Sequence, residues 1–261
     1  MKNQIIIHRT RIGKDIVAEF TIPRTETQQK EGKVIILCPG APSMPGKSVL
    51  LEFLATKGFH VVYPRYRGTW ESAGKFLENE PTEDIKEVID ALSQPLISLY
   101  EGQSYSFPKK LQIFLFASSF GGPASFFLSK DKRVSKVVAL SPVCDWLAQA
   151  STKPYELKDA YIKDLYGEGY RMAKKGWMKL AKGDFYNPMT AFDCIDAKKV
   201  LILHAEDDDI VGIESVERYA VVTDANLLVS KEGGHLGLSE IMSPETWKEV
   251  VKFLKKKSLA K

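Results

Sequence analysis

Short apolar runs alternate with amphipathic, helix-like stretches along most of this 261-residue chain, and this alternation constrains the fold more than any other feature. The runs that predict strands are Val34–Cys38, His60–Tyr63, Gln112–Phe116, Lys136–Leu140, Val200–His204 and Leu227–Ser230. The stretches that predict helices are Val49–Lys57, Thr82–Leu92, Gly122–Leu128, Ile213–Ala220 and Pro244–Lys255. The pattern predicts an α/β protein with a mostly parallel central sheet, flanked by helices and joined by right-handed crossovers.

The beginning of the chain departs from this alternation. Gln4–His8 and Ile16–Ile22 predict an antiparallel hairpin that enters the sheet. A hydrophobic content of 44% is enough to bury a large core, and the length suits one α/β domain.

The pentapeptide Ala117-Ser118-Ser119-Phe120-Gly121 stands between a predicted strand and a predicted helix. It lies one residue away from G-x-S-x-G, in which a sharp strand-to-helix turn exposes a serine. The turn places the serine in a sparsely populated backbone conformation, so the residues two positions away must be small. Gly121 meets this requirement, and Ala117 adds one methyl group. For the pentapeptide alone, a serine that caps a helix is the alternative.

An acid and a histidine follow two later predicted strands. Asp207-Asp208-Asp209 comes after the run that ends at His204, and His235 lies between glycines after the last run. Loops at the carboxyl ends of parallel strands converge on one crevice, so Ser119, one of the three acids and His235 are expected to meet. His204 is a second candidate base, but we expect it to pack at its strand end.

These residue types fit nucleophilic catalysis. A serine hydroxyl is a poor nucleophile at neutral pH, so a neighbouring imidazole must take its proton. A carboxylate behind the imidazole fixes its tautomer and stabilises the imidazolium. A non-catalytic binding protein is the alternative, although binding has no need of all three groups.

Several segments resemble those of the α/β-hydrolases. His204–Val211 is similar to the family's "H-G-x-x-D-x-x-V" segment, a match that selects Asp208 as the acid. Val34–Pro42 resembles the strand and "H-G-x" loop of the oxyanion hole, with Pro39 where the family often has His. Gly58–Gly68 resembles the next strand and its "Y-R-G" turn. The arrangement is most similar to the prolyl-oligopeptidase and dienelactone-hydrolase branches.

The resemblance implies an α/β-hydrolase fold with a helical cap insertion. The core would comprise residues 1–144 and 190–261, and the cap residues 145–189. The insertion carries eight aromatic residues, namely Trp146, Tyr155, Tyr161, Tyr166, Tyr170, Trp177, Phe185 and Tyr186. Each of them either lines a substrate pocket or packs the cap onto the core, and for any single residue packing is the expectation.

The resemblance also implies an oxyanion hole made of two backbone N–H groups. One belongs to Phe120, the residue after the nucleophile, at a helix N-terminus where the dipole helps. The other comes from the loop after the early strand. Pro39 and Pro42 have no N–H, so Ala41 is the expected donor.

The same loop carries a rival motif, because residues 41–48 match a permissive P-loop pattern that would bind a nucleotide. Phosphate binding requires consecutive N–H groups that converge on the anion. Pro42 and Pro45 remove two of them. This interpretation would also leave Ser119 and His235 unexplained.

The composition limits the kinds of partner and cofactor that we expect this chain to bind. The net charge of +4 comes from scattered residues, and no basic stripe with interleaved aromatics predicts nucleic-acid binding. The three cysteines lack metal-ligand spacing, which favours a reduced, cytoplasmic setting, and we expect no metal, no cofactor and no membrane span. Met1–Gln4 leads into only three isoleucines, too few for a signal peptide. We expect a serine hydrolase for a small carboxylic ester, or for a short peptide or amide.

Overall fold

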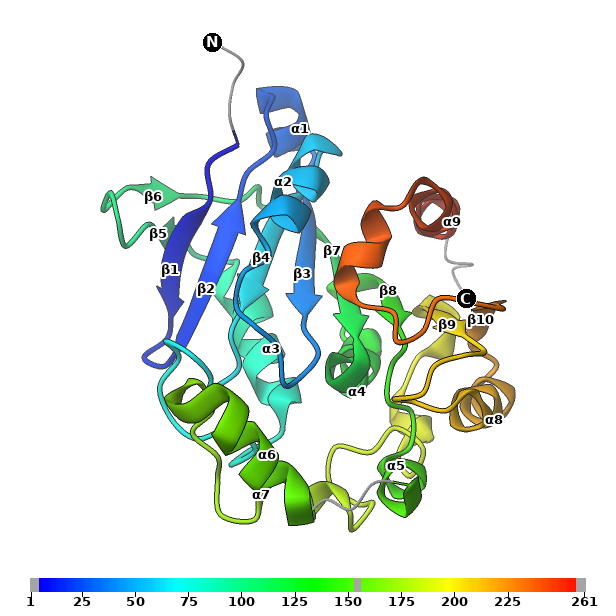
Figure 1. Ribbon diagram of the computed structural model, residues 1–261. Helices are drawn as coiled ribbons and strands as arrows, with labels where there is room; N and C mark the ends of the chain where they lie inside the picture. The colour runs from blue at the N-terminus through cyan, green and yellow to red at the C-terminus, as the bar shows by residue number, and fades with distance from the viewer. Residues whose placement is uncertain (1–4, 153–155, 257–261) are drawn as a thin grey trace.

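The computed structural model describes residues 5–152 and 156–256, and an eight-stranded sheet runs through it (Figure 1). The strand order is β1-β2-β4-β3-β7-β8-β9-β10. β2 is antiparallel to both of its neighbours, and all other pairs are parallel. The strands are β1 His8–Ile12, β2 Ile16–Thr21, β3 Lys33–Cys38, β4 His60–Pro64, β7 Gln112–Ser118, β8 Val134–Leu140, β9 Val200–Ala205 and β10 Asn226–Ser230. The predicted α/β architecture with a mostly parallel sheet is confirmed.

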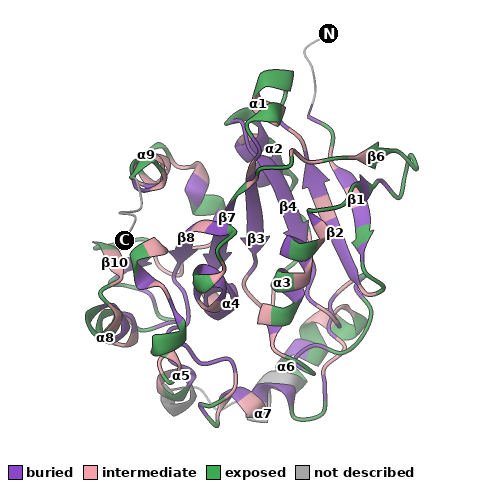
Figure 2. Ribbon diagram, turned by 180° about the vertical axis from the view of Figure 1, so that it is seen from behind, coloured by how far each residue is buried: buried purple, intermediate pink, exposed green. Residues whose placement is uncertain are grey.

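Helices cover both faces of the sheet. On one face α2 (Ser48–Thr56) and α9 (Pro244–Lys255) share a core with alternate strand residues such as Ile35 and Leu37. On the other face α3 (Pro81–Ala91), α4 (Gly122–Phe127) and α8 (Ile213–Thr223) pack on the intervening residues, such as Val34 and Ile36. The central strands are therefore buried on both sides (Figure 2), which explains their continuous apolar runs.

Three further helices lie between β8 and β9, in the part of the chain predicted to form the cap. They are α5 (Trp146–Thr152), α6 (Glu156–Tyr166) and α7 (Gly176–Leu180). A one-turn helix α1 (Glu26–Lys30) and a small hairpin of β5 (Leu96–Ile97) and β6 (Ser104–Tyr105) complete the elements outside the 3₁₀ turns. The domain limits at 144/145 and 189/190 stay predictions. Within the described ranges, no helix is long and apolar enough to cross a membrane.

The position predicted for the first strand is wrong. β1 spans His8–Ile12 rather than Gln4–His8, and Gln4 lies outside the described residues. Gly13, at φ 56°, starts a tight turn, so the strand that pairs with β2 must end next to it, with Ile12 opposite Ile16. His8 and Thr10 face the core as buried polar residues, and this polar character hid the strand from a search for apolar runs.

Candidate active site

Ser119 lies at the sharp turn that leaves the carboxyl end of β7. The 3₁₀ turn Ser119–Gly121 follows the strand directly, and α4 begins at Gly122. The φ angle of Ser119 is 49°, in the left-handed region that non-glycine residues rarely occupy. Such a conformation costs on the order of 1–3 kcal/mol and persists only where the surroundings enforce it. The residue is half-buried.

Close packing around this turn explains the small residues beside Ser119. A Cβ atom on Gly121 would lie 2.1 Å from the carbonyl oxygen of Cys38, at the end of β3. A Cβ atom on Gly40 would lie 3.2 Å from Ser119 Cβ. Gly121 is therefore needed because the first turn after β7 touches the neighbouring strand end. The sequence predicted a small residue here but not this neighbour.

Asp208 and His235 form a hydrogen-bonded pair at the carboxyl ends of β9 and β10. His235 Nδ1 lies 2.9 Å from Asp208 Oδ2 and 3.1 Å from Oδ1. The N–H groups of Ile210 and Val211 each donate to Asp208 Oδ1 at 2.9 Å. Burial opposes ionisation of Asp208, but the bonds from His235, Val211 and Ser141 outweigh it and hold the pKa of this carboxyl below its ordinary value.

The other two acids of the triplet, Asp207 and Asp209, are exposed. Asp207 accepts hydrogen bonds from the N–H groups of Gly233 and Gly234, so it shapes the loop that carries His235. His204 is 1% exposed, its Nε2 lies 2.9 Å from the carbonyl oxygen of Val211, and burial lowers its pKa. The structure thus packs His204 at the strand end and brings Asp208 to His235.

Ser141 links the histidine loop to the strand beside Ser119, a role that the sequence analysis missed. Ser118 and Leu140 are paired residues at the ends of β7 and β8, so Ser119 and Ser141 leave two neighbouring strands side by side. Ser141 Oγ accepts a hydrogen bond from the N–H of Leu236 at 2.9 Å, and Ser141 also helps to lower the pKa of Asp208. This serine follows an apolar strand like many others, so no sequence signal distinguishes it. Within the described residues, the hydrogen bonds of the His235 ring join its Nδ1 to Asp208, and none joins His235 to Ser119.

The backbone around Ser119 fixes the direction of the Phe120 N–H. The carbonyl oxygen of Ser119 accepts a hydrogen bond from the N–H of Val143 at 3.1 Å. Since the C=O and N–H of a trans peptide point in opposite directions, the Phe120 N–H points away from Val143. The N–H lies at the start of a helical segment, where such groups lack an intrahelical acceptor.

The loop after β3, which carries Ala41, is fastened close to Ser119. Tyr66 Oη donates to the carbonyl oxygen of Pro39 at 3.1 Å. The Ser43 N–H donates to Tyr170 Oη at 2.8 Å, and Trp70 Nε1 donates to the Ser43 carbonyl at 3.1 Å. Because Tyr170 already takes the Ser43 N–H, and two prolines have none, this loop offers no converging set of donors for a phosphate.

Aromatic residues of the predicted cap pack beneath the Ser119 turn. The Phe120 ring lies 5.8, 5.6 and 5.2 Å, centroid to centroid, from those of Trp146, Trp177 and Tyr186. These three and Tyr170 are buried, so they pack the predicted cap onto the core. Tyr166 and Phe185 are half-buried and Tyr161 is exposed, while Tyr155 lies outside the described residues.

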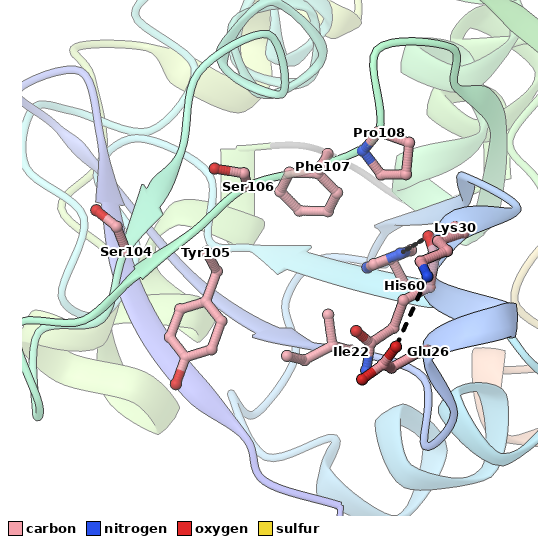
Figure 3. Close-up of a pocket in the computed structure, with 10 residues that line it drawn as sticks. Ile22, Glu26, Lys30, His60, Ser104, Tyr105, Ser106, Phe107 and Pro108 are labelled. Atoms are coloured by element: carbon pink, nitrogen blue, oxygen red, sulfur yellow. Dashed lines mark hydrogen bonds and ion pairs between the residues drawn. The ribbon is translucent and has the colours of Figure 1, made fainter.

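A pocket between β4 and the segment around β6 lies away from this site. It has a volume of about 570 Å³ and opens near the amino-terminal end of β4, where His60 begins the strand (Figure 3). It is lined by Tyr105, the last residue of β6, and by Phe107 in the segment after that strand. Ser119 and His235 follow carboxyl ends of strands, so this pocket is not part of their site. Among the described residues, no group of three or more His, Cys, Asp or Glu side chains could hold a metal ion.

The strand order, the Ser119 turn and the Asp208–His235 pair together define an α/β-hydrolase fold, which structural comparison supports. The chain is similar to an acylaminoacyl peptidase of Pyrococcus horikoshii, with a TM-score of 0.65 and 17% identity over 98% of this chain. It is similar to the esterase Pf2001 of Pyrococcus furiosus, with a TM-score of 0.65 and 20% identity over 96% of this chain and 90% of that one. An alpha-beta serine hydrolase homologue from Coxiella burnetii gives a TM-score of 0.53 and 17% identity over 97% of this chain and 96% of that one.

The acylaminoacyl peptidase is a longer protein, of which this chain spans 43%. No protein-family model and no curated protein matches the sequence. At these identities the likeness establishes the fold, and function has to be argued from the site.

Proposed function

We propose that this protein is a serine hydrolase that cleaves a carboxylic ester through an acyl-enzyme on Ser119. The observation that carries the proposal is the Asp208–His235 hydrogen bond, at 2.9 Å, in loops that Ser141 anchors beside the strained Ser119 turn. A structural histidine needs no buried carboxylate behind it, and a structural serine needs no left-handed φ. A peptide or amide is the second substrate class, since esterases and an acylaminoacyl peptidase share the fold.

The first half of the reaction forms the acyl-enzyme. His235 Nε2 takes the proton of Ser119 Oγ as the oxygen attacks the ester carbonyl carbon, and Asp208 stabilises the resulting imidazolium. The carbonyl oxygen becomes an oxyanion that the N–H groups of Phe120 and Ala41 stabilise. The C–O bond to the alcohol then breaks, and His235 returns the proton to the leaving alkoxide. Bonds of the Ser–His type are often long without substrate and tighten in the complex.

The second half releases the acid. His235 takes a proton from a water molecule, whose oxygen attacks the acyl carbon. The tetrahedral intermediate collapses, the bond to Ser119 Oγ breaks, and the proton returns to Ser119. Each oxyanion-hole donor contributes about 3 kcal/mol to transition-state stabilisation.

The test is labelling with a fluorophosphonate probe, located by peptide mass, together with hydrolysis of short p-nitrophenyl esters. We expect an adduct on Ser119 that is lost in Ser119→Ala and His235→Ala. Ser118→Ala is the matched control, because it removes the neighbouring, buried hydroxyl and should keep both labelling and turnover. Folded protein without an adduct would refute the proposal and favour a binding role for the same fold.

A further inference from the structure

Tyr186 reaches from the predicted cap to the turn that follows Ser119. Its side chain is 1% exposed, and its hydroxyl makes two hydrogen bonds there. Oη donates to the carbonyl oxygen of Phe120 at 2.9 Å and accepts from the N–H of Ala124 at 3.1 Å. Burial raises the pKa of Tyr186 well above its ordinary value, so the hydroxyl keeps the proton that it donates.

The two groups bridged by this hydroxyl are ordinarily hydrogen-bonded to each other. Phe120 and Ala124 are four residues apart, and an uninterrupted α-helix joins the N–H of residue i to the carbonyl of residue i−4. Here the chain forms a 3₁₀ turn over Ser119–Gly121, and α4 begins only at Gly122. A side chain inserted in the i to i−4 ladder is a recognised cause of a bend in a helix. The hydroxyl therefore occupies the place of a helical bond and keeps this first turn open.

The backbone of Tyr186 is itself held in an unusual conformation. Its φ angle is 58°, a left-handed value that is uncommon for a tyrosine. Its N–H donates to Glu80 Oε1 at 3.2 Å, and its carbonyl accepts from Trp146 Nε1 at 2.8 Å. All three polar groups of the residue are thus paired, through four hydrogen bonds, so its hydroxyl has one position. Strain that is enforced in this way is characteristic of functional sites.

From these contacts we propose that Tyr186 is a positioning residue for the oxyanion hole. This role rests on the hydrolase function proposed above. The Ser119 carbonyl is fixed by Val143 and the Phe120 carbonyl by Tyr186, so both peptide planes next to the Phe120 N–H are set. Without the hydroxyl, the Phe120 carbonyl and the Ala124 N–H can close into a direct helical bond. That closure rotates the Phe120–Gly121 peptide about the Phe120 Cα and so displaces the adjoining Ser119–Phe120 peptide, which carries the Phe120 N–H, away from its place opposite the oxyanion.

The test compares Tyr186→Phe with Tyr219→Phe on a p-nitrophenyl ester. Tyr219, in α8, is also fully buried, and its ring stacks on Phe126 of α4, the helix whose first turn Tyr186 contacts. The Tyr219 hydroxyl has no hydrogen-bond partner within the described residues. We expect Tyr186→Phe to lower kcat about 10-fold with KM unchanged, because an oxyanion donor is misaligned rather than removed. The binding affinity for a boronic acid that mimics the tetrahedral intermediate should fall by the same factor. Tyr219→Phe should match the wild type.

The outcomes separate the two proposals. Absence of fluorophosphonate labelling in the wild type would overturn the hydrolase function itself. If the wild type is labelled but Tyr186→Phe keeps its kcat and boronate affinity, only the positioning role is overturned. The same holds if Tyr186→Phe and Tyr219→Phe lose kcat equally. If Tyr186→Phe does not fold, 4-fluorophenylalanine introduced in place of Tyr186 is used instead, since its fluorine is closer in size to the hydroxyl but cannot donate to the Phe120 carbonyl. A lower kcat at unchanged KM then supports the role, and wild-type kcat overturns it.

Discussion

Replacing Gly121 by alanine tests the close packing that holds the Ser119 turn. The new Cβ atom would lie 2.1 Å from the carbonyl oxygen of Cys38 and 2.7 Å from that of Pro39. Both neighbours are backbone atoms, so no side chain can rotate away. Restoring an ordinary contact requires the start of α4 and the end of β3 to separate by about 1 Å.

Both stability and activity should respond to this shift. Overpacking costs about 1–3 kcal/mol, and we expect about 3 kcal/mol here because only backbone can yield. For a chain of this size, that corresponds to a Tm lower by roughly 6–12 °C. A displacement of about 1 Å at Ser119 and the Phe120 N–H should lower kcat about 100-fold if the protein acts as proposed.

The assay combines thermal unfolding, followed by circular dichroism, with turnover of a p-nitrophenyl ester. Gly46→Ala is the matched control, because a Cβ atom there has no other atom within 4 Å and the backbone is not left-handed. Its Tm should stay within about 2 °C of the wild type. If Gly121→Ala keeps the wild-type Tm and kcat, the described contact between the turn and β3 is wrong.

Three further predictions concern the site, and a fourth concerns the cysteines. Asp208→Asn should lower kcat about 10⁴-fold, with Asp209→Asn as the active control. Because the folded pKa of Asp208 is lowered, its carboxylate stabilises the fold above the unfolded pKa, and this stability is lost as pH falls through the folded pKa. The difference in the free energy of unfolding between the wild type and Asp208→Asn, measured in urea, should therefore shrink from about pH 5 to about pH 2. A difference that stays constant over this range would contradict the prediction. Ser141→Ala leaves the Leu236 N–H without its acceptor, so kcat should fall about tenfold, and an unchanged kcat would show that Ser141 does not position the histidine loop. In the native protein, only the exposed thiol of Cys194 should react with Ellman's reagent, since Cys38 and Cys144 are buried and burial raises their pKa. After unfolding, all three thiols should react. Rapid reaction of a second thiol in the native protein would contradict the burial of Cys38 and Cys144.

Sequence alone predicted the layers of the fold. Apolar runs such as Val34–Cys38 alternate with helical stretches because central parallel strands need apolar residues on both faces. A small residue at position 121 was predictable as well, since a sharp turn after a strand restricts space in any surroundings. The first strand was not, because His8 and Thr10 face the core and carry no apolar signal.

The partner that each neighbouring acid faces was visible only in the tertiary structure. Residue patterns left Asp207, Asp208 and Asp209 open, and the family resemblance selected Asp208. The fold buries that carboxylate against His235 and turns Asp207 to the glycine loop. Tyr186 lies more than sixty residues from Phe120 in the chain, yet its hydroxyl bonds to that backbone. Local sequence determines propensity and turn geometry, which act over a few residues. Contacts between distant segments depend on how the whole chain crosses the sheet, and so only the tertiary structure decided them.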